Sequence, residues 1–330
     1  MSRSPLTAAG RAAAPSVVAE REGGTMRVME GASVPGSQAE DRADAGAENR
    51  AADRVVPEGL RDWRIVVAVR DYPHDAATIE WALAHTVRGV DTVHLVHAYS
   101  PLRLDGCHWQ PVARARGARA MAGRRVVAIA LQRIAAAYPA LGQDGSAVAG
   151  TPEDVLEQMS EVADLVVVGD DSLEPATPRP ITWRVQDAAS CPVVCVPAGY
   201  RTEAGSPVTV VVDEQGWDPV LEFGVQVAMR SGAGLQVSRS WSALHEMLPE
   251  TDEWLADQQR AFDTQLTEWQ DRYPAVPISA RIELDDAWPG RLRRSSSLLV
   301  ATSYAAARVR SLPSDPVQQA CPIAIVPDGG

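Results

Sequence analysis

The chain has 330 residues and 45% hydrophobic side chains, enough for about two domains with buried cores. Its formal net charge of −12 argues against a nucleic-acid-binding surface, which needs a basic stripe. All 31 basic residues are Arg, so the chain lacks the Lys of a phosphate-binding P-loop. No apolar run reaches the roughly 18 residues of a membrane span, and no signal-peptide pattern opens the chain, so we expect a cytoplasmic protein.

Residues 1–60 are rich in Ala, Gly, Ser, Arg and Glu and show no apolar periodicity. Such a segment cannot bury enough apolar surface to offset chain entropy, so we expect it to be disordered. A translation start at Met26 or Met29 would shorten it, and the sequence leaves the choice between these and Met1 open.

Order is expected from residue 61, where strands and helices alternate as far as residue 199. WRIVVAVR is a continuous apolar run with β-branched residues, which is typical of a strand buried on both faces. Further strands are predicted at DTVHLVHAY, GSAVAG, DLVVVGD and CPVVCVP, with helices between them. This alternation predicts a parallel, doubly wound α/β sheet.

Residues 206–330 repeat this order of elements. PVTVVVDEQ corresponds to the first strand, SLLVATS to DLVVVGD, and ACPIAIVP to SCPVVCVP. We therefore predict two tandem α/β domains, residues 61–199 and 206–330, joined by the polar linker YRTEAG.

Several motifs follow one another in residues 61–199: VAVRDYP, IEWALAHT, VHLVHAY, AGTPEDVLEQMSEVADLVVVGD and SCPVVCVP. This series resembles the universal stress protein family. The resemblance implies two tandem UspA-like domains with the fold of the adenine nucleotide alpha hydrolases, the second of them divergent.

Two similar runs, SCPVVCVP and ACPIAIVP, each place a short apolar strand between two prolines. Proline lacks the N–H that a central ladder needs, so each strand should lie at the edge of its own sheet. Members of the family use this last strand to join two domains. The resemblance therefore implies that Val193–Val196 and Ile323–Val326 pair within one chain, while a homodimer and a separate protein partner stay open.

The resemblance also implies where a ligand would bind. Some family members hold ATP beyond the central strands, where an acidic residue ends the first strand and a glycine-rich loop after the fourth cradles the phosphates. Here Arg70 stands at the acidic position, followed by Asp71, and the loop GDDSLEPATPRPIT keeps only Gly169. Its acidic residues repel a polyphosphate and its prolines remove N–H donors, so both features oppose nucleotide binding in the first half.

The second half keeps Asp213 at the end of its first strand, but its loop TSYAAARVRSLPSDP has no Gly. Arg308 and Arg310 are either contacts for an anion or solvated helix charges. Trp217 and Trp288, predicted on loops near this crevice, either fill the space of a nucleotide or line a flatter ligand site.

Other residues carry weaker signals. His94 and His97 lie three apart on a strand and so point to opposite faces, which prevents them from chelating one metal together. The four Cys show neither a disulfide framework nor a zinc pattern. No Ser–His–Asp order or catalytic dyad stands out. A helix predicted at about 250–273 has an acidic face that is either solvated or a docking surface for a basic protein.

We interpret the chain as a non-enzymatic, tandem universal-stress-like protein with degenerate nucleotide sites, no cofactor and a regulatory or protein-interaction role in a stress response. The alternative is a sensor that binds ATP or AMP in the second half through Asp213. An ATP-hydrolysing enzyme is disfavoured, because neither a general base nor a phosphate cradle is visible.

Overall fold

The computed structural model describes most of the chain beyond residue 58. The described residues are 59–100, 109–139, 141–170, 181–201, 205–212, 217–240, 252–283, 288–302, 305 and 321–327. The segment predicted to be disordered therefore lies outside the described residues, except for its last two, Gly59 and Leu60.

Strands and helices alternate along the described residues. The elements of the first half are β1 (Arg64–Ala68), α2 (Tyr72–Ala84), β2 (Thr92–Tyr99), α3 (Trp109–Ala137), β3 (Gln143–Ala149), α4 (Pro152–Ser160), β4 (Leu165–Gly169), α5 (Ile181–Ala188) and β5 (Val193–Val196). Those of the second half are β6 (Val208–Val212), α6 (Asp218–Ser231), β7 (Leu235–Ser240), α7 (Asp252–Arg272), β8 (Ile278–Glu283), α8 (Trp288–Ser295), β9 (Leu298–Thr302) and β10 (Ile323–Val326).

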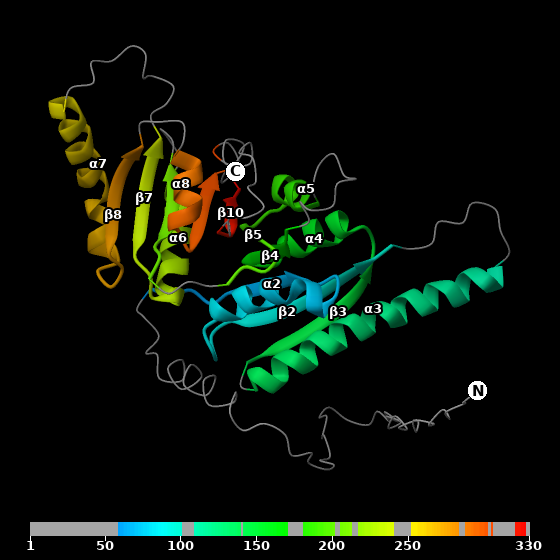
Figure 1. Ribbon diagram of the computed structural model, residues 1–330. Helices are drawn as coiled ribbons and strands as arrows, with labels where there is room; N and C mark the ends of the chain where they lie inside the picture. The colour runs from blue at the N-terminus through cyan, green and yellow to red at the C-terminus, as the bar shows by residue number, and fades with distance from the viewer. Residues whose placement is uncertain are drawn as a thin grey trace, which may run out of the picture. The chain divides into compact units, whose positions relative to one another are not determined.

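The described strands form one ten-stranded sheet in the order β3-β2-β1-β4-β5-β10-β9-β6-β7-β8 (Figure 1). The order β3-β2-β1-β4-β5 of the first half recurs in the second as β8-β7-β6-β9-β10. Pairing between the described strands is parallel everywhere except between β5 and β10. The prediction of a mostly parallel α/β sheet is confirmed.

Helices cover both faces of this sheet. Side chains of α2, α3, α6 and α7 belong to one core that runs through both halves. On the other face, α4 and α5 pack over the first half and α8 over the second. Alternate residues of β1 serve the two faces, because Ile65 and Val67 lie in the first core and Val66 in the second. Among the described helices, none combines the length and the apolar character that crossing a bilayer requires.

The two halves join through β5 and β10, the strands that prolines bracket in the sequence. Their antiparallel register places Val194 opposite Ala324, and both side chains are fully buried. The prolines before the strands take part through their carbonyl oxygens, since Pro192 O accepts from Val166 N and Pro322 O from Leu299 N, both at 3.0 Å. Each proline therefore still contributes one hydrogen bond to the parallel ladder of its own half.

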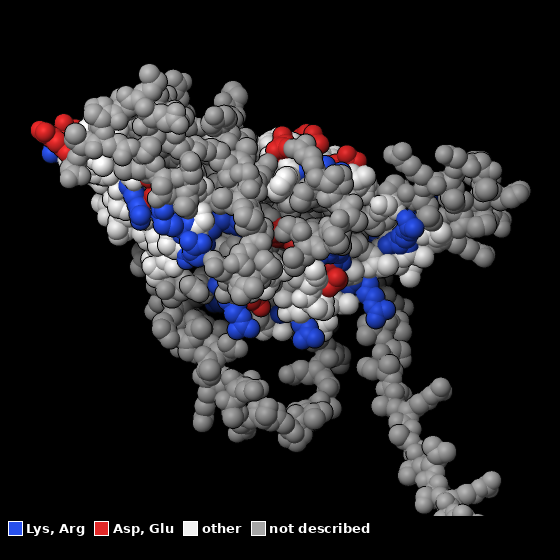
Figure 2. Space-filling model, turned by 45° about the horizontal axis from the view of Figure 1, so that its top comes forward, with Lys and Arg blue, Asp and Glu red and all other residues white. Residues whose placement is uncertain are grey.

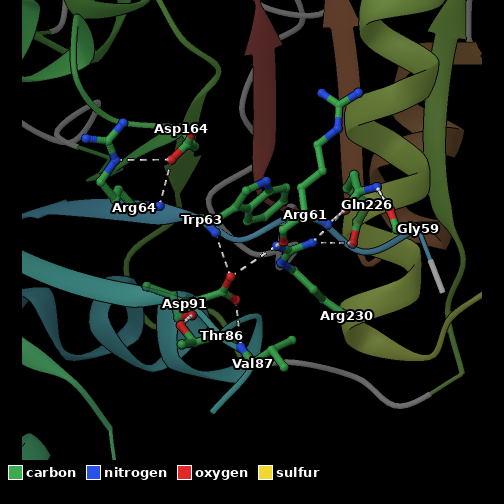
Figure 3. A network of polar contacts seen from close by, with 11 residues as sticks. Gly59, Arg61, Trp63, Arg64, Thr86, Val87, Asp91, Asp164, Gln226 and Arg230 are labelled. Atoms are coloured by element: carbon green, nitrogen blue, oxygen red, sulfur yellow. Dashed lines mark hydrogen bonds and ion pairs between the residues drawn. The ribbon is translucent and has the colours of Figure 1, made fainter. Parts of the chain in front are cut away.

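A buried ion pair also links the halves (Figure 3). Arg230 on α6 places its Nη2 3.2 Å from Asp91 Oδ1, and neither side chain is exposed to solvent. The Asp91 carboxylate also accepts from the backbone N–H groups of Trp63 and Val87, each at 2.7 Å. The Arg230 guanidinium lies over the Trp63 ring, 3.5 Å from its centroid, and Nη2 donates to Arg61 O at 2.5 Å. The Asp91 carboxylate thus binds donors from both halves.

The segment that precedes β1 packs along α6. Gln226 Nε2 donates to Gly59 O at 2.9 Å, and Gln226 Oε1 accepts from Arg61 N at 3.1 Å. The Trp63 ring stacks on Phe223 with centroids 5.5 Å apart. Order therefore reaches back at least to Gly59, two residues before the predicted boundary.

Candidate functional site

The first crevice lies beyond the carboxyl ends of β1 and β4, where the strand order of the first half reverses. In doubly wound sheets this reversal is the usual place for a ligand. The elements around it are the turn between β1 and α2, the first turns of α2, and the end of β4.

Asp71 caps the helix at this crevice. Its side chain accepts from His74 N at 3.0 Å, and its extended backbone conformation is the usual one for an N-cap. Asp71, the candidate next to the family's acidic position, therefore binds a helix N–H of its own chain.

Asp75 is the acidic residue that occupies the crevice, and it was not singled out from the sequence. The Asp75 Oδ2 atom accepts from the backbone N–H groups of Arg70, at 2.5 Å, and Asp71, at 3.0 Å. Its own backbone, at φ −94° and ψ 15°, departs from helical geometry and kinks the first turn of α2. The kink accompanies a carboxylate that reaches back over the turn after β1.

Gly169 at the end of β4 lies against this carboxylate. A Cβ at Gly169 would lie 3.1 Å from both Asp75 Oδ1 and Thr78 Oγ1, so these oxygens lie directly against Gly169. Asp75 is 5% exposed, and burial raises the pKa of its carboxyl, although the two N–H groups act in the opposite direction. The next N–H, that of Asp170, donates to Val196 O at 2.8 Å. The backbone N–H groups of Arg70, Asp71 and Asp170 are therefore all bound by oxygens of the protein.

The second half has an equivalent crevice where its strand order reverses between β6 and β9. Asp213, Arg308 and Arg310 lie outside the described residues, as does most of the acidic, proline-rich loop that follows Gly169. The described part of this crevice consists of the ends of β6 and β9 and the beginning of α6.

The two tryptophans predicted near the second crevice lie in different cores. Trp288 begins helix α8 instead of lying on a loop, and with 1% exposure it belongs to the core under α8. Trp217 precedes α6 and packs on the opposite face, edge-on to Phe262 with ring centroids 5.5 Å apart. The Arg239 guanidinium lies 4.3 Å from the Trp217 ring centroid and 4.5 Å from that of Phe262. The tryptophans therefore do not line a common site.

Two hollows among the described residues lie away from the first crevice. One of about 310 Å³ is lined by Trp63, Phe223 and the prolines 192, 219 and 327, with acidic and basic side chains at its rim. Trp63 precedes β1 and Pro192 precedes β5, so this hollow lies at the amino ends of these strands, away from the first crevice. Its volume is at the lower limit for a small-molecule site.

The charged and metal-ligating side chains of the described residues form no concentrated site. Figure 2 shows Arg side chains spread over one face with Asp and Glu among them, not gathered into one basic stripe. Within the described ranges, no three His, Cys, Asp or Glu side chains come close enough together to hold a metal ion. Burial raises the pKa of the Cys191 and Cys321 thiols to about 12, which keeps both protonated and unreactive at neutral pH.

The comparisons agree with the fold. Residues 63–197 match the model of the universal stress protein family, so the first half of the chain contains a domain of that family. No curated protein matches the chain.

Solved structures similar to this chain include universal stress proteins. One from Archaeoglobus fulgidus is 14% identical, with a TM-score of 0.53, and the match covers 81% of this chain and 97% of that one. A putative universal stress protein from Pseudomonas aeruginosa is 13% identical, with a TM-score of 0.47 over 82% of this chain and 94% of that one. A protein of this family from Arabidopsis thaliana, solved with AMP bound, is 18% identical, with a TM-score of 0.31 over 43% and 95%. The first of these likenesses shows the shared fold.

Proposed function

We propose that the chain is a tandem universal-stress-like protein, located in the cytoplasm, whose two halves are paired domains of this kind. In this proposal it acts through regulatory contacts with other proteins in a stress response, and the crevices perform no catalysis on a nucleotide. The observation that carries the proposal is Asp75, which fills the first crevice and binds the N–H donors of its turn. The negative charge of the Asp75 carboxylate would repel the phosphates of a nucleotide in this crevice.

The repeated strand order supports the tandem arrangement. The two halves have the same strand order, and the last strand of each, β5 or β10, pairs with the last strand of the other. The match to the family model ends at residue 197, so the second half is proposed to be a divergent copy.

A thermal-shift screen with ATP, ADP, AMP and cyclic AMP, each at 1 mM with Mg²⁺, tests this proposal. A ligand present at 100 times its Kd would stabilise the protein by about 2.7 kcal/mol, which raises Tm by about 5 °C or more. We expect shifts no larger than that of an equal concentration of magnesium pyrophosphate. A nucleotide-specific shift of several degrees would contradict the proposal.

The second candidate function is an adenine-nucleotide sensor that uses the second half. The observation that favours it is Asp213, an acidic residue directly after β6, where the family has its nucleotide contact. If the screen shows a shift, Asp213→Ala should remove it, and Arg70→Ala, the matched change in the first half, should not.

A further inference from the structure

A serine, a histidine and an aspartate lie close together on β2 and β3, the two strands at the first-half end of the described sheet. His94 Nδ1 is 2.6 Å from Asp144 Oδ1, and His94 Nε2 is 2.8 Å from Ser146 Oγ. These distances are those of hydrogen bonds between a carboxylate, an imidazole and a hydroxyl. The sequence does not reveal the set, because 50 residues separate the carboxylate from the histidine along the chain.

The register of β2 and β3 produces this arrangement. His94 lies directly opposite Asp144, and Ser146 is two residues farther along β3, so all three side chains point to one face. It is the face of Val66 and Val96, which pack under α4 and α5, whereas α3 covers the other face. His97, by contrast, donates from Nδ1 to Val69 O at 2.8 Å and lies beneath Gly123 of α3.

The two hydrogen bonds select one state of the imidazole. A carboxylate only accepts, so the proton of neutral His94 resides on Nδ1 and points at Asp144. Nε2 then carries the lone pair and accepts from the Ser146 hydroxyl. This is the protonation pattern in which a histidine can take the proton of a serine nucleophile.

The set is accessible to a ligand. The His94 side chain is 30% exposed and that of Asp144 77%, and Ser146 is half-buried. Figure 1 shows β3 with α3 running beside it, and β3 is the last strand at this end of the described sheet.

The backbone beside Ser146 offers donors for a developing negative charge. Val93 N donates to Gly142 O, and Gly150 N to Tyr99 O, so the even-numbered residues of β3 direct their backbone groups to β2. By the alternation of the ladder, the N–H groups of Gly145 and Ala147 point toward the outer edge of the sheet. An N–H of the residue that follows the nucleophile is a common oxyanion donor in serine hydrolases.

We propose that Ser146 is a nucleophile, with His94 as its general base and Asp144 as the residue that positions His94, and that it reacts with short-chain activated carboxylic esters. The Oγ–carbonyl bond forms while the proton of Oγ moves to Nε2, and the ester C–O bond breaks as the alcohol leaves with that proton. Water then attacks the acyl–Ser146 ester, gives its proton to Nε2, and releases the carboxylic acid as Ser146 regains its proton.

The described residues at the equivalent positions of the second half differ from this set and provide an internal control. In the equivalent pairing of β7 and β8, Gln236 lies opposite Ser279, and Ser238 opposite Arg281. Ser279 Oγ donates to the Leu235 carbonyl at 3.5 Å. Ser279 thus stands at the position equivalent to Asp144, Arg281 at that of Ser146, and the residue opposite Ser279 is Gln236 instead of a histidine.

The test is acetylation of the full chain by p-nitrophenyl acetate, followed by release of p-nitrophenol and by peptide mapping. We expect the acetyl group on Ser146, and a rate that falls at least about tenfold in both Ser146→Ala and His94→Gln. Ser279→Ala should react at the rate of the unmodified chain. Tm values measured in parallel identify any variant that fails to fold.

Mapping of the unmodified chain with a fluorophosphonate probe keeps the test independent of the variants, and it should place the label on Ser146. Asp144→Asn should slow acetylation at unchanged Tm and alter its pH profile, which a purely structural role would not do. Label found only on other residues, or a Ser146→Ala chain that folds and reacts at the full rate, would overturn the proposal. Because these esters contain no nucleotide, the result is independent of the thermal-shift screen.

Discussion

The ion pair between Asp91 and Arg230 has both side chains fully buried. Burial lowers the pKa of the Arg230 guanidinium, and the Asp91 carboxylate opposes that change. Arg230→Met would leave Asp91 without its charged partner in the interior, which costs about 3–5 kcal/mol of the free energy of unfolding. Urea denaturation measures this loss.

The matched control is Arg260→Met on α7, whose ion pair with Asp257 has side-chain exposures of 73% and 56%. An exposed pair contributes at most about 1 kcal/mol, so this variant should unfold nearly as the unmodified chain does. Equal losses in the two variants would show that the buried pair does not hold the halves together.

His85 should make the stability depend on pH. It is buried, stacks on Trp81 with ring centroids 4.1 Å apart, and burial lowers its pKa from 6.5 to about 4. The unfolded chain then binds a proton that the folded chain does not, so stability is lost as the pH falls from about 6.5 toward 4. In His85→Phe, which keeps an aromatic ring, the free energy of unfolding should change less between pH 7 and pH 5. An unchanged pH dependence would assign the effect to other groups.

At the scale of elements, α6 packs closely on the sheet at one glycine. A Cβ at Gly224 would lie 2.4 Å from Val210 Cγ2 and 3.2 Å from Leu235 Cδ1, so Gly224→Ala should destabilise by about 1–3 kcal/mol despite the better helix propensity of Ala. Gly117 in α3 has nothing within 4 Å of such a Cβ, and Gly117→Ala should stabilise by about 0.5–1 kcal/mol. Thermal unfolding of both variants checks the opposite signs, and a stabilising Gly224→Ala would contradict the close packing.

Local patterns predicted the elements well. The apolar runs became β1, β4 and β6 because their residues are buried on both faces, a pattern visible without knowledge of the fold. Trp288 was expected on a loop. The short run WPGRLRRS contains a proline and a glycine, and it nevertheless forms helix α8. One face of α8 is buried because the helix packs on the sheet, and local helix propensity does not predict that packing.

The candidate sites depend on contacts between distant residues. Gly169 was placed at the crevice from the motif order, but Asp75 was not, because an acidic residue in a first helical turn is ordinarily explained by the helix dipole. Its position in DYPHD, four residues after Asp71, was the available signal. The pairing of His94 with Asp144 requires the register of two strands, which the sequence does not specify.

At the scale of the whole molecule, the β5–β10 ladder should make the two halves unfold together. Val194→Asp would bury a charge opposite Ala324 in the middle of the sheet, and both halves should lose stability. Hydrogen exchange should then show faster exchange in β4 and β9 alike. If Ile323–Val326 keeps its protection while the first half loosens, the halves are not coupled through these strands.

The central claim is that the crevices do not hold a nucleotide tightly, because a carboxylate of the protein already occupies the first of them. Isothermal titration of the full chain with Mg-ATP tests this most directly. We predict no saturable binding in the micromolar range. A Kd of roughly 10 micromolar or tighter, about −6.8 kcal/mol, would contradict the account.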